Sequence, residues 1–340
     1  MATMKDVALA SGYSLSTVSI VIRGDAEKRH IPKSTQTHIY EVAASLGYMP
    51  NVSARRLRKN TSQKNVAVFW TTDYRSVLVS RFLRGIQQYI ADSNSGVEVT
   101  ICPYTPDQLN LFATPQRLQL YSAVIICTAS DTDLAYIESV SCHTPVILYN
   151  RTSDMFSTVV ADNAKIGAMI ADAFHAGECK RSIVVTDRQN HLFTQHRVEK
   201  FLNALQKYEI PADIVRVDAN TITDGRLAGE RLVFQPDVHY GIFTTSDLLG
   251  IGVLRACINR KISIPDTLEI ISIGSQDTAL YDNLDIPLAV IDIPIQQMGY
   301  HCLQIANDLI EHSLDAPVHK VVECCPHYNG SCRYRMEKET

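Results

Sequence analysis

The 340-residue sequence has no run of about 18 apolar residues, the length that a membrane-spanning helix needs. Its first ten residues, MATMKDVALA, lack a basic segment followed by an apolar core, which predicts no secretory signal and a cytoplasmic protein. Motifs typical of catalysis are also missing: GxSxG, a P-loop, HExxH, and GxGxxG after a strand. We therefore expect neither a membrane protein nor an enzyme.

The nine cysteines are odd in number and form no CxxC pair. Cys324, Cys325 and Cys332 lie close together in the sequence, with His327 as their only obvious companion. A metal site there is the weaker interpretation, and reduced thiols without a ligand role are the better one. We expect no metal and no cofactor.

Charge is distributed unevenly along the chain. The formal net charge is −4, but residues 1–64 hold ten Lys and Arg against four Asp and Glu, so this segment is +6 and the rest −10. A basic head on an acidic body is typical of a polyanion-binding module joined to an unrelated domain, although a solvated basic face gives the same count. The length and the 46% hydrophobic content indicate two or three globular domains.

The first sixty residues predict short helices. Met4–Ser11 and Leu15–Arg23 flank Gly12, where the chain can turn sharply, and Ser14 can cap the second helix. A third helix follows Pro32, with apolar residues at positions 39, 42, 43 and 46.

The first two of these helices fit a helix-turn-helix. Val7, Val18 and Val21 can close a small core, and such a turn places its second helix in the major groove of DNA. Ser and Thr hydroxyls on that helix can bind phosphates, which fixes the register without reading sequence. An ordinary helical hairpin is the alternative. The face expected to contact DNA comprises Leu15, Ser16, Thr17, Ser19, Ile20 and Arg23.

From about Asn65 apolar runs alternate with amphipathic segments, which predicts parallel sheets covered on both faces. The predicted fold is therefore an all-α helix-turn-helix headpiece followed by a two-lobed α/β sensor. Its longer helices are expected at Phe82–Ile90, Ile166–Phe174, Val198–Leu205, Leu248–Cys257 and Met298–Ile310. The expected domains are a headpiece at 1–49, a hinge helix and linker at 50–64, a first lobe at 65–160 with 293–323, and a second lobe at 161–292 with 324–340.

Two stretches, KDVALASGYSLSTVS and ASLGYMPNVSARRLR, together with the α/β body that follows them, resemble the LacI/GalR repressor family over essentially the whole chain. The resemblance implies that Leu15, Ser16 and Ile20 occupy the sequence-reading positions and that Tyr48 and Asn51 approach the DNA backbone. The family usually has Arg at the position of Ile20, where it can pair with guanine, whereas Ile20 can contact a thymine methyl group.

The hinge segment VSARRLR combines small and basic residues with one large apolar side chain, Leu57. A helix this short is marginal alone. The resemblance implies that it forms on operator DNA, with two copies in the minor groove and Leu57 as a wedge between base pairs. It also implies that Ala54 allows close approach to the groove and that phosphates are met by Arg55, Arg56 and Arg58.

The resemblance further implies a periplasmic-binding-protein-like (type I) sensor, with an effector bound between its lobes. The residues expected at that site are Asp73, Tyr74, Asn150, Arg151, Phe193, Arg197, Ser246, Asp247 and Ser275. Asn150, Ser246 and Gly274 replace residues with which the family often holds sugars. An anionic ligand held by Arg151 and Arg197 is therefore an alternative to a neutral sugar, and a protein co-regulator or a pocket without a ligand also stays open.

Simpler roles are open for three of these charged residues. Asp247 can cap the helix from Leu248, Asp162 can cap the helix from Asn163, and Arg197 can form an interlobe ion pair.

Together these features predict a homodimeric repressor that binds double-stranded operator DNA under the control of a sugar or phosphosugar effector. By analogy, the dimer interface is expected around Phe82, Leu83, Ile86 and Tyr89 and at the helix from Met298. The competing hypotheses are a solute receptor, which predicts a secretion signal, and a sugar-modifying enzyme, which predicts a catalytic motif.

Overall fold

The computed structural model describes residues 4–22, 26, 29–46, 64–72, 76–188, 192–276, 278–315 and 317–334. They belong to two compact units, Met1–Gln63 and Lys64–Thr340, and each unit is described by itself. Several residues predicted to bind DNA or effector lie outside the described residues, so those predictions stay predictions: Arg23, Tyr48, Asn51, Ala54, Arg55, Arg56, Leu57, Arg58, Asp73 and Tyr74.

The first unit contains α1 (Met4–Ser11), α2 (Leu15–Ile22) and α3 (Lys33–Ser45). Gly12 follows α1 with φ +73°, a left-handed conformation that glycine adopts without strain and that ends the helix. The three helices close a small core whose buried members are Val7, Val18, Val21, Ala26, Ile39 and Ala43. The predicted helices and core are confirmed for the residues that the structure describes.

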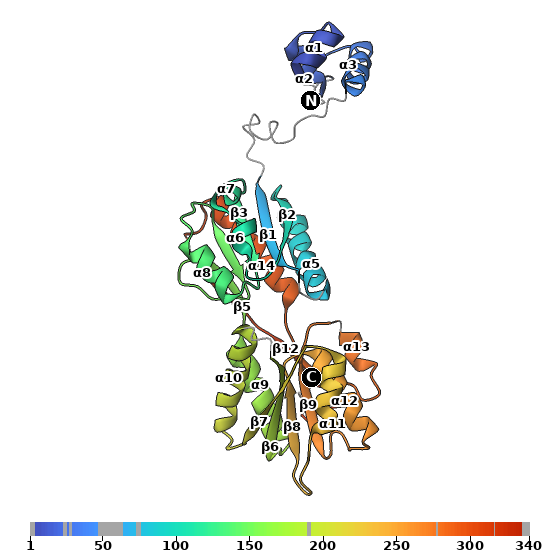
Figure 1. Ribbon diagram of the computed structural model, residues 1–340, viewed down its shortest axis with the longest axis vertical. Coiled ribbons are helices and arrows are strands. Elements are labelled where there is room, and N and C mark those ends of the chain that lie inside the picture. The colour runs from blue at the N-terminus through green and yellow to red at the C-terminus, as the bar shows by residue number, and fades with distance from the viewer. Residues whose placement is uncertain are drawn as a thin grey trace. The chain divides into compact units, whose positions relative to one another are not determined.

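The first lobe of the second unit is built on a parallel sheet in the order β11-β5-β4-β3-β1-β2 (Figure 1). Successive residues of β1 enter different cores: Val68 packs in one hydrophobic cluster and Phe69 in another, so the sheet is covered on both faces. The strands are β1 (Asn65–Thr71), β2 (Glu98–Tyr104), β3 (Ala123–Cys127), β4 (Val146–Tyr149), β5 (Ser157–Ala161) and β11 (His319–Val322). The helices are α5 (Ser76–Ser93), α6 (Leu109–Phe112), α7 (Pro115–Leu118), α8 (Asp131–Ser139) and α14 (Ile295–Ile310).

The second lobe repeats this architecture with the order β12-β10-β9-β8-β6-β7, in which only the pairing of β12 with β10 is antiparallel. Its strands are β6 (Arg181–Asp187), β7 (Ala212–Val217), β8 (Tyr240–Thr244), β9 (Leu268–Gly274), β10 (Ala289–Asp292) and β12 (Cys325–His327). Its helices are α9 (Asn163–Ala176), α10 (Leu192–Gln206), α11 (Ile222–Arg231), α12 (Asp247–Asn259) and α13 (Thr278–Asp282).

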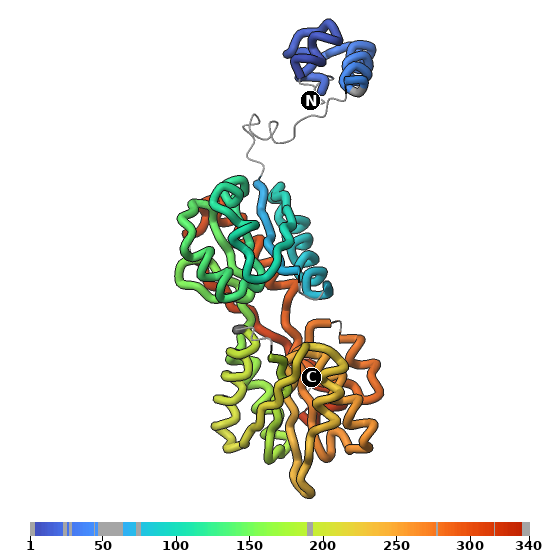
Figure 2. Tube along the Cα trace, viewed as in Figure 1, coloured from blue at the N-terminus to red at the C-terminus, as the bar shows by residue number. Residues whose placement is uncertain are grey.

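The chain passes between the lobes after β5, after β10 and again between β11 and β12 (Figure 2). Beside these crossings, Arg81 of α5 forms a two-pronged ion pair with Asp292 at the end of β10, with N–O distances of 2.9 and 3.0 Å. Each guanidinium nitrogen reaches a different carboxylate oxygen, the geometry in which such pairs are strongest. The lobes are therefore tied by a charged contact as well as by the chain.

Helices α5 and α14 pack with their backbones unusually close. A Cβ at Gly85 would lie 1.8 Å from the carbonyl oxygen of Gln296, and one at Gly299 would lie 2.4 Å from that of Phe82. The contact buries Phe82, Ile86 and Tyr89 on α5 and Met298 on α14. The expectation that these four residues form the dimer interface is therefore wrong, because they fill the core of the lobe; Leu83 is only half-buried.

Several elements are longer than the sequence indicated or were not predicted at all. α5 and α10 extend beyond their apolar stretches, and α8, α11, β5, β11 and β12 were missed. α11 packs against α12 through Gly225 and Gly229, where glycine allows close contact but leaves no apolar pattern in the sequence. No helix in the described part of the chain is both long and apolar enough to cross a membrane.

Replacing Gly85 by Ala tests the close packing of α5 on α14. The new methyl group must displace the backbone of α14, so we expect the variant to lose about 1–3 kcal/mol of stability, as overpacked cores do. Asp92→Ala on an exposed site of the same helix should change stability by less than about 0.5 kcal/mol. Denaturant titration followed by circular dichroism measures both, and a Gly85→Ala variant as stable as the Asp92→Ala control would contradict the packing.

Candidate functional site

The N-terminus of α2 is organised by Ser14. Its hydroxyl accepts a hydrogen bond from the backbone N–H of Thr17 at 3.1 Å, which confirms the predicted cap. The same hydroxyl lies 2.7 Å from that of Ser16 and 2.8 Å from that of Thr17. The first turn of α2 therefore presents a cluster of three hydroxyl groups at the end of the helix where its dipole attracts anions.

Helix α2 has one face in the core and one directed to solvent. Val18 and Val21 are buried, whereas the side chain of Leu15 is 44% exposed and Ser16 is exposed beside it. Ser19 and Ile20 are half-buried and follow Leu15 and Ser16 by one helical turn. The structure thus gathers the predicted DNA-reading residues that it describes on one stripe of α2.

Contacts with α3 hold this stripe in place. Tyr40 donates a hydrogen bond to the carbonyl oxygen of Val21 at 2.7 Å, at the C-terminal end of α2. Tyr13, in the turn before α2, packs edge-on against His38 with ring centroids 6.1 Å apart. Both ends of α2 are therefore fixed against α3, which orients the stripe as a rigid surface.

The second unit has a cavity of about 330 Å³. Residues of both lobes line it: Leu78, Tyr149, Asn150, Asp187, Phe193, Thr194, Arg197, Ala219, Asn220, Thr221, Thr245, Ser246, Ile273, Ser275, Ile293 and Ile295. Five predicted effector residues, Asn150, Phe193, Arg197, Ser246 and Ser275, are in this set, whereas Arg151 and Asp247 are not.

The polar wall of the cavity comes from the carboxyl ends of parallel strands. Asn150 follows β4, Asp187 ends β6, Ser246 follows β8 and Ser275 follows β9. Parallel strands end at the same edge of a sheet, which is where open α/β folds bind ligands. The topology therefore brings together side chains that are far apart in the sequence.

One guanidinium and one carboxylate face the cavity. Arg197 of α10 is only 4% exposed, and its Nε donates a hydrogen bond to Asn163 Oδ1 at 3.2 Å. Asp187 is likewise buried at the end of β6. Because the two charges oppose each other, the cavity carries no excess charge from its described Asp, Glu, Lys and Arg side chains.

Hydroxyl and amide groups of the cavity wall form hydrogen bonds with one another. Ser246 Oγ donates to Asn220 Oδ1 and accepts from the N–H of Leu249 at 3.3 Å, so it is Ser246 that caps α12. Thr245 donates to Thr186 Oγ1 at 3.1 Å. The predicted alternative that Asp247 caps this helix is wrong, whereas the cap of α9 by Asp162 is confirmed, with Lys165 N–H donating at 2.9 Å.

Asp247 lies behind the cavity wall and is fully buried. Its Oδ2 accepts hydrogen bonds from Ser275 N–H at 3.2 Å, Ser275 Oγ at 2.8 Å and Tyr281 Oη at 2.7 Å. Burial raises the pKa of Tyr281, and the negative charge of Asp247 raises it further, so the phenol stays a hydrogen-bond donor. Asp247 therefore positions Ser275 rather than contacting the cavity.

Arg151 is not among the residues that line the 330 Å³ cavity. It forms an ion pair with Asp131 of α8 and lines a smaller hollow of about 110 Å³, which shares Asn150 and Phe193 with the cavity. Its side chain is only 6% exposed, so its charge is balanced locally. The expectation that Arg151 and Arg197 act together on an anionic ligand does not fit this arrangement.

Sequence reasoning missed several residues that line the cavity. Asp187 directly follows a predicted apolar run and Thr245 ends one, so the rule that ligands bind at strand ends would have selected both. Thr194, Asn220 and Thr221 come from a helix start and a loop, for which the sequence gives no comparable signal.

Comparison with known proteins gives two family matches. Residues 3–51 match the model of bacterial regulatory proteins of the lacI family, and residues 146–332 match the periplasmic binding protein-like domain. The second match alone covers more than half of the chain.

Individual relatives span most of the chain. A probable HTH-type transcriptional repressor, ExuR, of Bacillus subtilis is 25% identical over 88% of this chain and 89% of its own length. The ribose operon repressor of Escherichia coli K12 is 23% identical over 93% of this chain and 94% of its own. A LacI family transcription regulator from Clostridium acetobutylicum has a similar structure, with a TM-score of 0.72 at 29% identity, covering 78% of this chain and 99% of that one.

Replacing Asp247 by Ala tests its positioning role. The change removes the acceptor of the Ser275 and Tyr281 hydroxyl groups and of the Leu248 N–H, which costs about 1–3 kcal/mol, and it frees the backbone around Ser275. We expect faster hydrogen–deuterium exchange in peptides that cover residues 268–281 and lower thermal stability. Asp285→Ala, at an exposed carboxylate paired with Arg255, is the control and should leave both measurements near wild type. Equal effects of the two substitutions would contradict this role.

Proposed function

The chain belongs to the LacI family of bacterial regulatory proteins, and on that premise we propose that it is a dimeric transcriptional repressor whose affinity for operator DNA is controlled by a small sugar-like effector. The observation that carries this proposal is the combination of a helix-turn-helix stripe held by a small core in one unit with a cavity lined by both lobes in the other.

The DNA-binding part of the proposal rests on α2. Its first turn offers hydroxyl groups that can bind phosphates, and Leu15, Ser16 and Ile20 lie where base edges would be read. Ile20 can contact a thymine methyl group but accepts and donates no hydrogen bond, so we propose a half-site without a guanine requirement at that step. In the hinge, Leu57 is proposed as the minor-groove wedge and Arg55, Arg56 and Arg58 as phosphate contacts.

The effector part rests on the composition of the cavity. Arg197 and Asp187 can each hold a pair of neighbouring hydroxyl groups, and Phe193 with Ile273 and Ile293 supplies an apolar surface for a sugar ring. A cavity of about 330 Å³ is near the lower end for small-molecule sites, which favours a ligand of monosaccharide size. We propose a neutral sugar before a phosphorylated one, because Asp187 would repel a phosphate and Arg197 is the one Lys or Arg side chain among the described residues that line the cavity.

A homodimer is proposed through the outer face of the first lobe. Val79, Leu83 and Arg84 of α5 and Ile101 of β2 line an open hollow of about 640 Å³ there. Ile101 is 39% exposed although it lies in β2, a strand at the edge of its sheet. Two copies meeting here would bring together two headpieces for a palindromic operator.

Selection from a randomised duplex library tests DNA binding by the full-length chain. Wild type should enrich a near-palindromic site bound by two chains, and its affinity should fall about 10³- to 10⁵-fold between 50 and 200 mM salt if 6–10 phosphates are contacted. Ile20→Arg should add a preference for guanine at one position of each half-site, worth about 1–3 kcal/mol.

Leu9→Arg is the matched control, because Leu9 is 87% exposed on α1 and the substitution adds the same charge away from the reading stripe. It should strengthen binding to all sequences without a new base preference. An Ile20→Arg variant that selects the wild-type sites would remove Ile20 from the reading set, and failure of wild type to bind any duplex would end the proposal.

A ligand screen tests the cavity. Thermal shift with D-ribose and other neutral sugars, hexuronates, sugar phosphates and nucleosides should single out a neutral sugar. Arg197→Leu should weaken that ligand about 10- to 150-fold, because a charged hydrogen bond contributes about 1.5–3 kcal/mol. Arg188→Leu, at the same edge of the sheet but 67% exposed, should bind as wild type. Tighter binding of a sugar phosphate than of its parent sugar would contradict the neutral-ligand assignment.

A further inference from the structure

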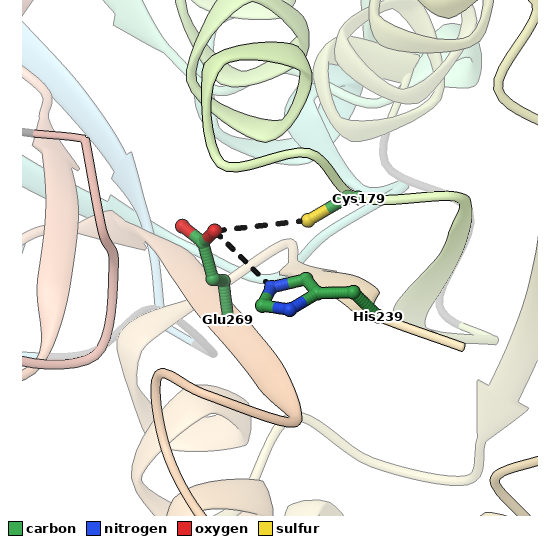
Figure 3. A group of neighbouring side chains, drawn as sticks. All are labelled: Cys179, His239 and Glu269. Atoms are coloured by element: carbon green, nitrogen blue, oxygen red, sulfur yellow. Dashed lines mark hydrogen bonds and ion pairs between the residues drawn. The ribbon is translucent and has the colours of Figure 1, made fainter. Parts of the chain in front are cut away.

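A second group of chemically reactive side chains lies in the second lobe, away from the cavity. Cys179, His239 and Glu269 bring one thiol sulfur, one imidazole nitrogen and one carboxylate oxygen within 4.8 Å of one another (Figure 3). None of the three lines the cavity of the proposed effector site.

The cluster is placed by the same three strands as the cavity, but at their opposite ends. Cys179 precedes β6, His239 precedes β8, and Glu269 is the second residue of β9. Gly241 of β8 pairs with Glu269, and Arg181 of β6 pairs with Tyr240 of β8, so the three strand starts are neighbours. Along β6 the cluster and the cavity are separated by about 20 Å, at about 3.3 Å per residue.

An ion pair between His239 and Glu269 does not fully account for this cluster, because its polar atoms are buried. Glu269 is fully buried, and the backbone N–H of Arg333 donates to its Oε2 at 2.8 Å. The other oxygen, Oε1, lies 3.3 Å from His239 Nε2, yet that nitrogen is buried and forms no hydrogen bond with any residue that the structure describes. The carboxylate accepts hydrogen bonds from Cys179 Sγ–H and Arg333 N–H, but a buried imidazole nitrogen without a hydrogen bond costs free energy unless something else compensates it.

Two of the three distances between these atoms are close to the edges of a zinc tetrahedron, and the third is within 4.8 Å. With Zn–N and Zn–O bonds of about 2.0–2.2 Å at tetrahedral angles, the nitrogen and oxygen ligands are about 3.3–3.5 Å apart, and with Zn–S of about 2.3 Å the sulfur and oxygen are about 3.6 Å apart. The corresponding distances are 3.3 Å from His239 Nε2 and 3.8 Å from Cys179 Sγ to Glu269 Oε1. A single ion can therefore bind all three atoms with little rearrangement.

We propose that Cys179, His239 and Glu269 bind one Zn²⁺ ion that stabilises the second lobe. A set of one thiolate, one imidazole and one carboxylate is typical of zinc rather than of Mg²⁺ or Ca²⁺, which take oxygen ligands. Binding replaces the proton of the Cys179 thiol, which is released to solvent, and the metal then compensates the buried carboxylate.

Two neighbours support this assignment. Gly177 ends α9, and a Cβ there would lie 1.8 Å from Glu269 Oε1, so the glycine leaves room for the carboxylate to sit beside Cys179. Cys332 is buried, and its thiol interacts with the side chain of Glu269. Its sulfur is therefore a candidate for the fourth ligand of the ion.

Metal content and a cobalt spectrum test the proposal on the full-length chain. Protein purified under reducing conditions with zinc in the medium should retain about one zinc per chain after gel filtration, measured by elemental analysis. Replacing zinc by Co²⁺ should give a thiolate-to-metal charge-transfer band. Cys179→Ala should abolish the band and weaken metal binding by more than about 100-fold, since loss of an outer partner alone costs 10- to 100-fold.

Cys257→Ala is the matched control, because Cys257 is a fully buried thiol in the same lobe and leaves a cavity of the same kind. It should keep the zinc and the band. A wild-type chain that takes up no zinc, or a Cys179→Ala variant that binds zinc as tightly as Cys257→Ala, would overturn the proposal. If Cys179→Ala does not fold, the wild-type cobalt spectrum decides, because a spectrum without the thiolate band excludes Cys179 as a ligand.

Discussion

The parallel direction of β6, β8 and β9 is the constraint on which the chemistry of the sensor depends. Because the three strands run the same way, their carboxyl ends meet at one edge and their amino ends at the other. The first edge carries Asp187, Ser246 and Ser275, whose side chains line the cavity. The second carries His239 and Glu269 of the buried cluster. The cavity and the buried cluster therefore lie at opposite ends of the same strands.

The cavity wall also depends on buried polar groups that no ligand touches. Asp247 contacts no part of the cavity, but its carboxylate collects donors from Ser275 and Tyr281. A buried carboxylate is tolerated because these donors satisfy it, and in return the loop after β9 has a single arrangement. Ser275 is therefore presented to the cavity by a network behind it rather than by its own strand alone.

The sequence predicted those parts of the fold and site that follow from local pattern. Apolar runs indicated the central strands, whereas Asn150, Ser246 and Ser275 were predicted from the family resemblance and do line the cavity. Contacts between residues far apart in the sequence were not predictable. No local feature of the sequence identifies Asp131 as the residue that forms an ion pair with Arg151.

The packing of α11 and the position of Cys332 were also not predictable from local sequence. α11 was missed because its packing surface consists of glycines, which in a sequence indicate turns rather than a helix face. Cys332 was grouped with Cys324 and Cys325 by nearness in sequence, whereas the fold sets it beside Glu269 on a strand 63 residues earlier. Long-range placement of this kind follows from sheet order, which a strand-by-strand reading does not provide.

The described contacts also limit how a ligand can act on the rest of the molecule. Leu78 and Arg81 are one turn apart on α5; the first lines the cavity, and the second holds Asp292 at the end of β10. Arg81 also donates to the carbonyl oxygen of Gln276, whose N–H bonds Tyr281 in the Asp247 network. A ligand shifts a conformational equilibrium only by the difference in its affinity for the two states. A ligand that fills the cavity would touch Leu78 on one lobe and Ser275 on the other, so its affinity would depend on the spacing of the two lobes, to which α5 contributes both Leu78 and Arg81.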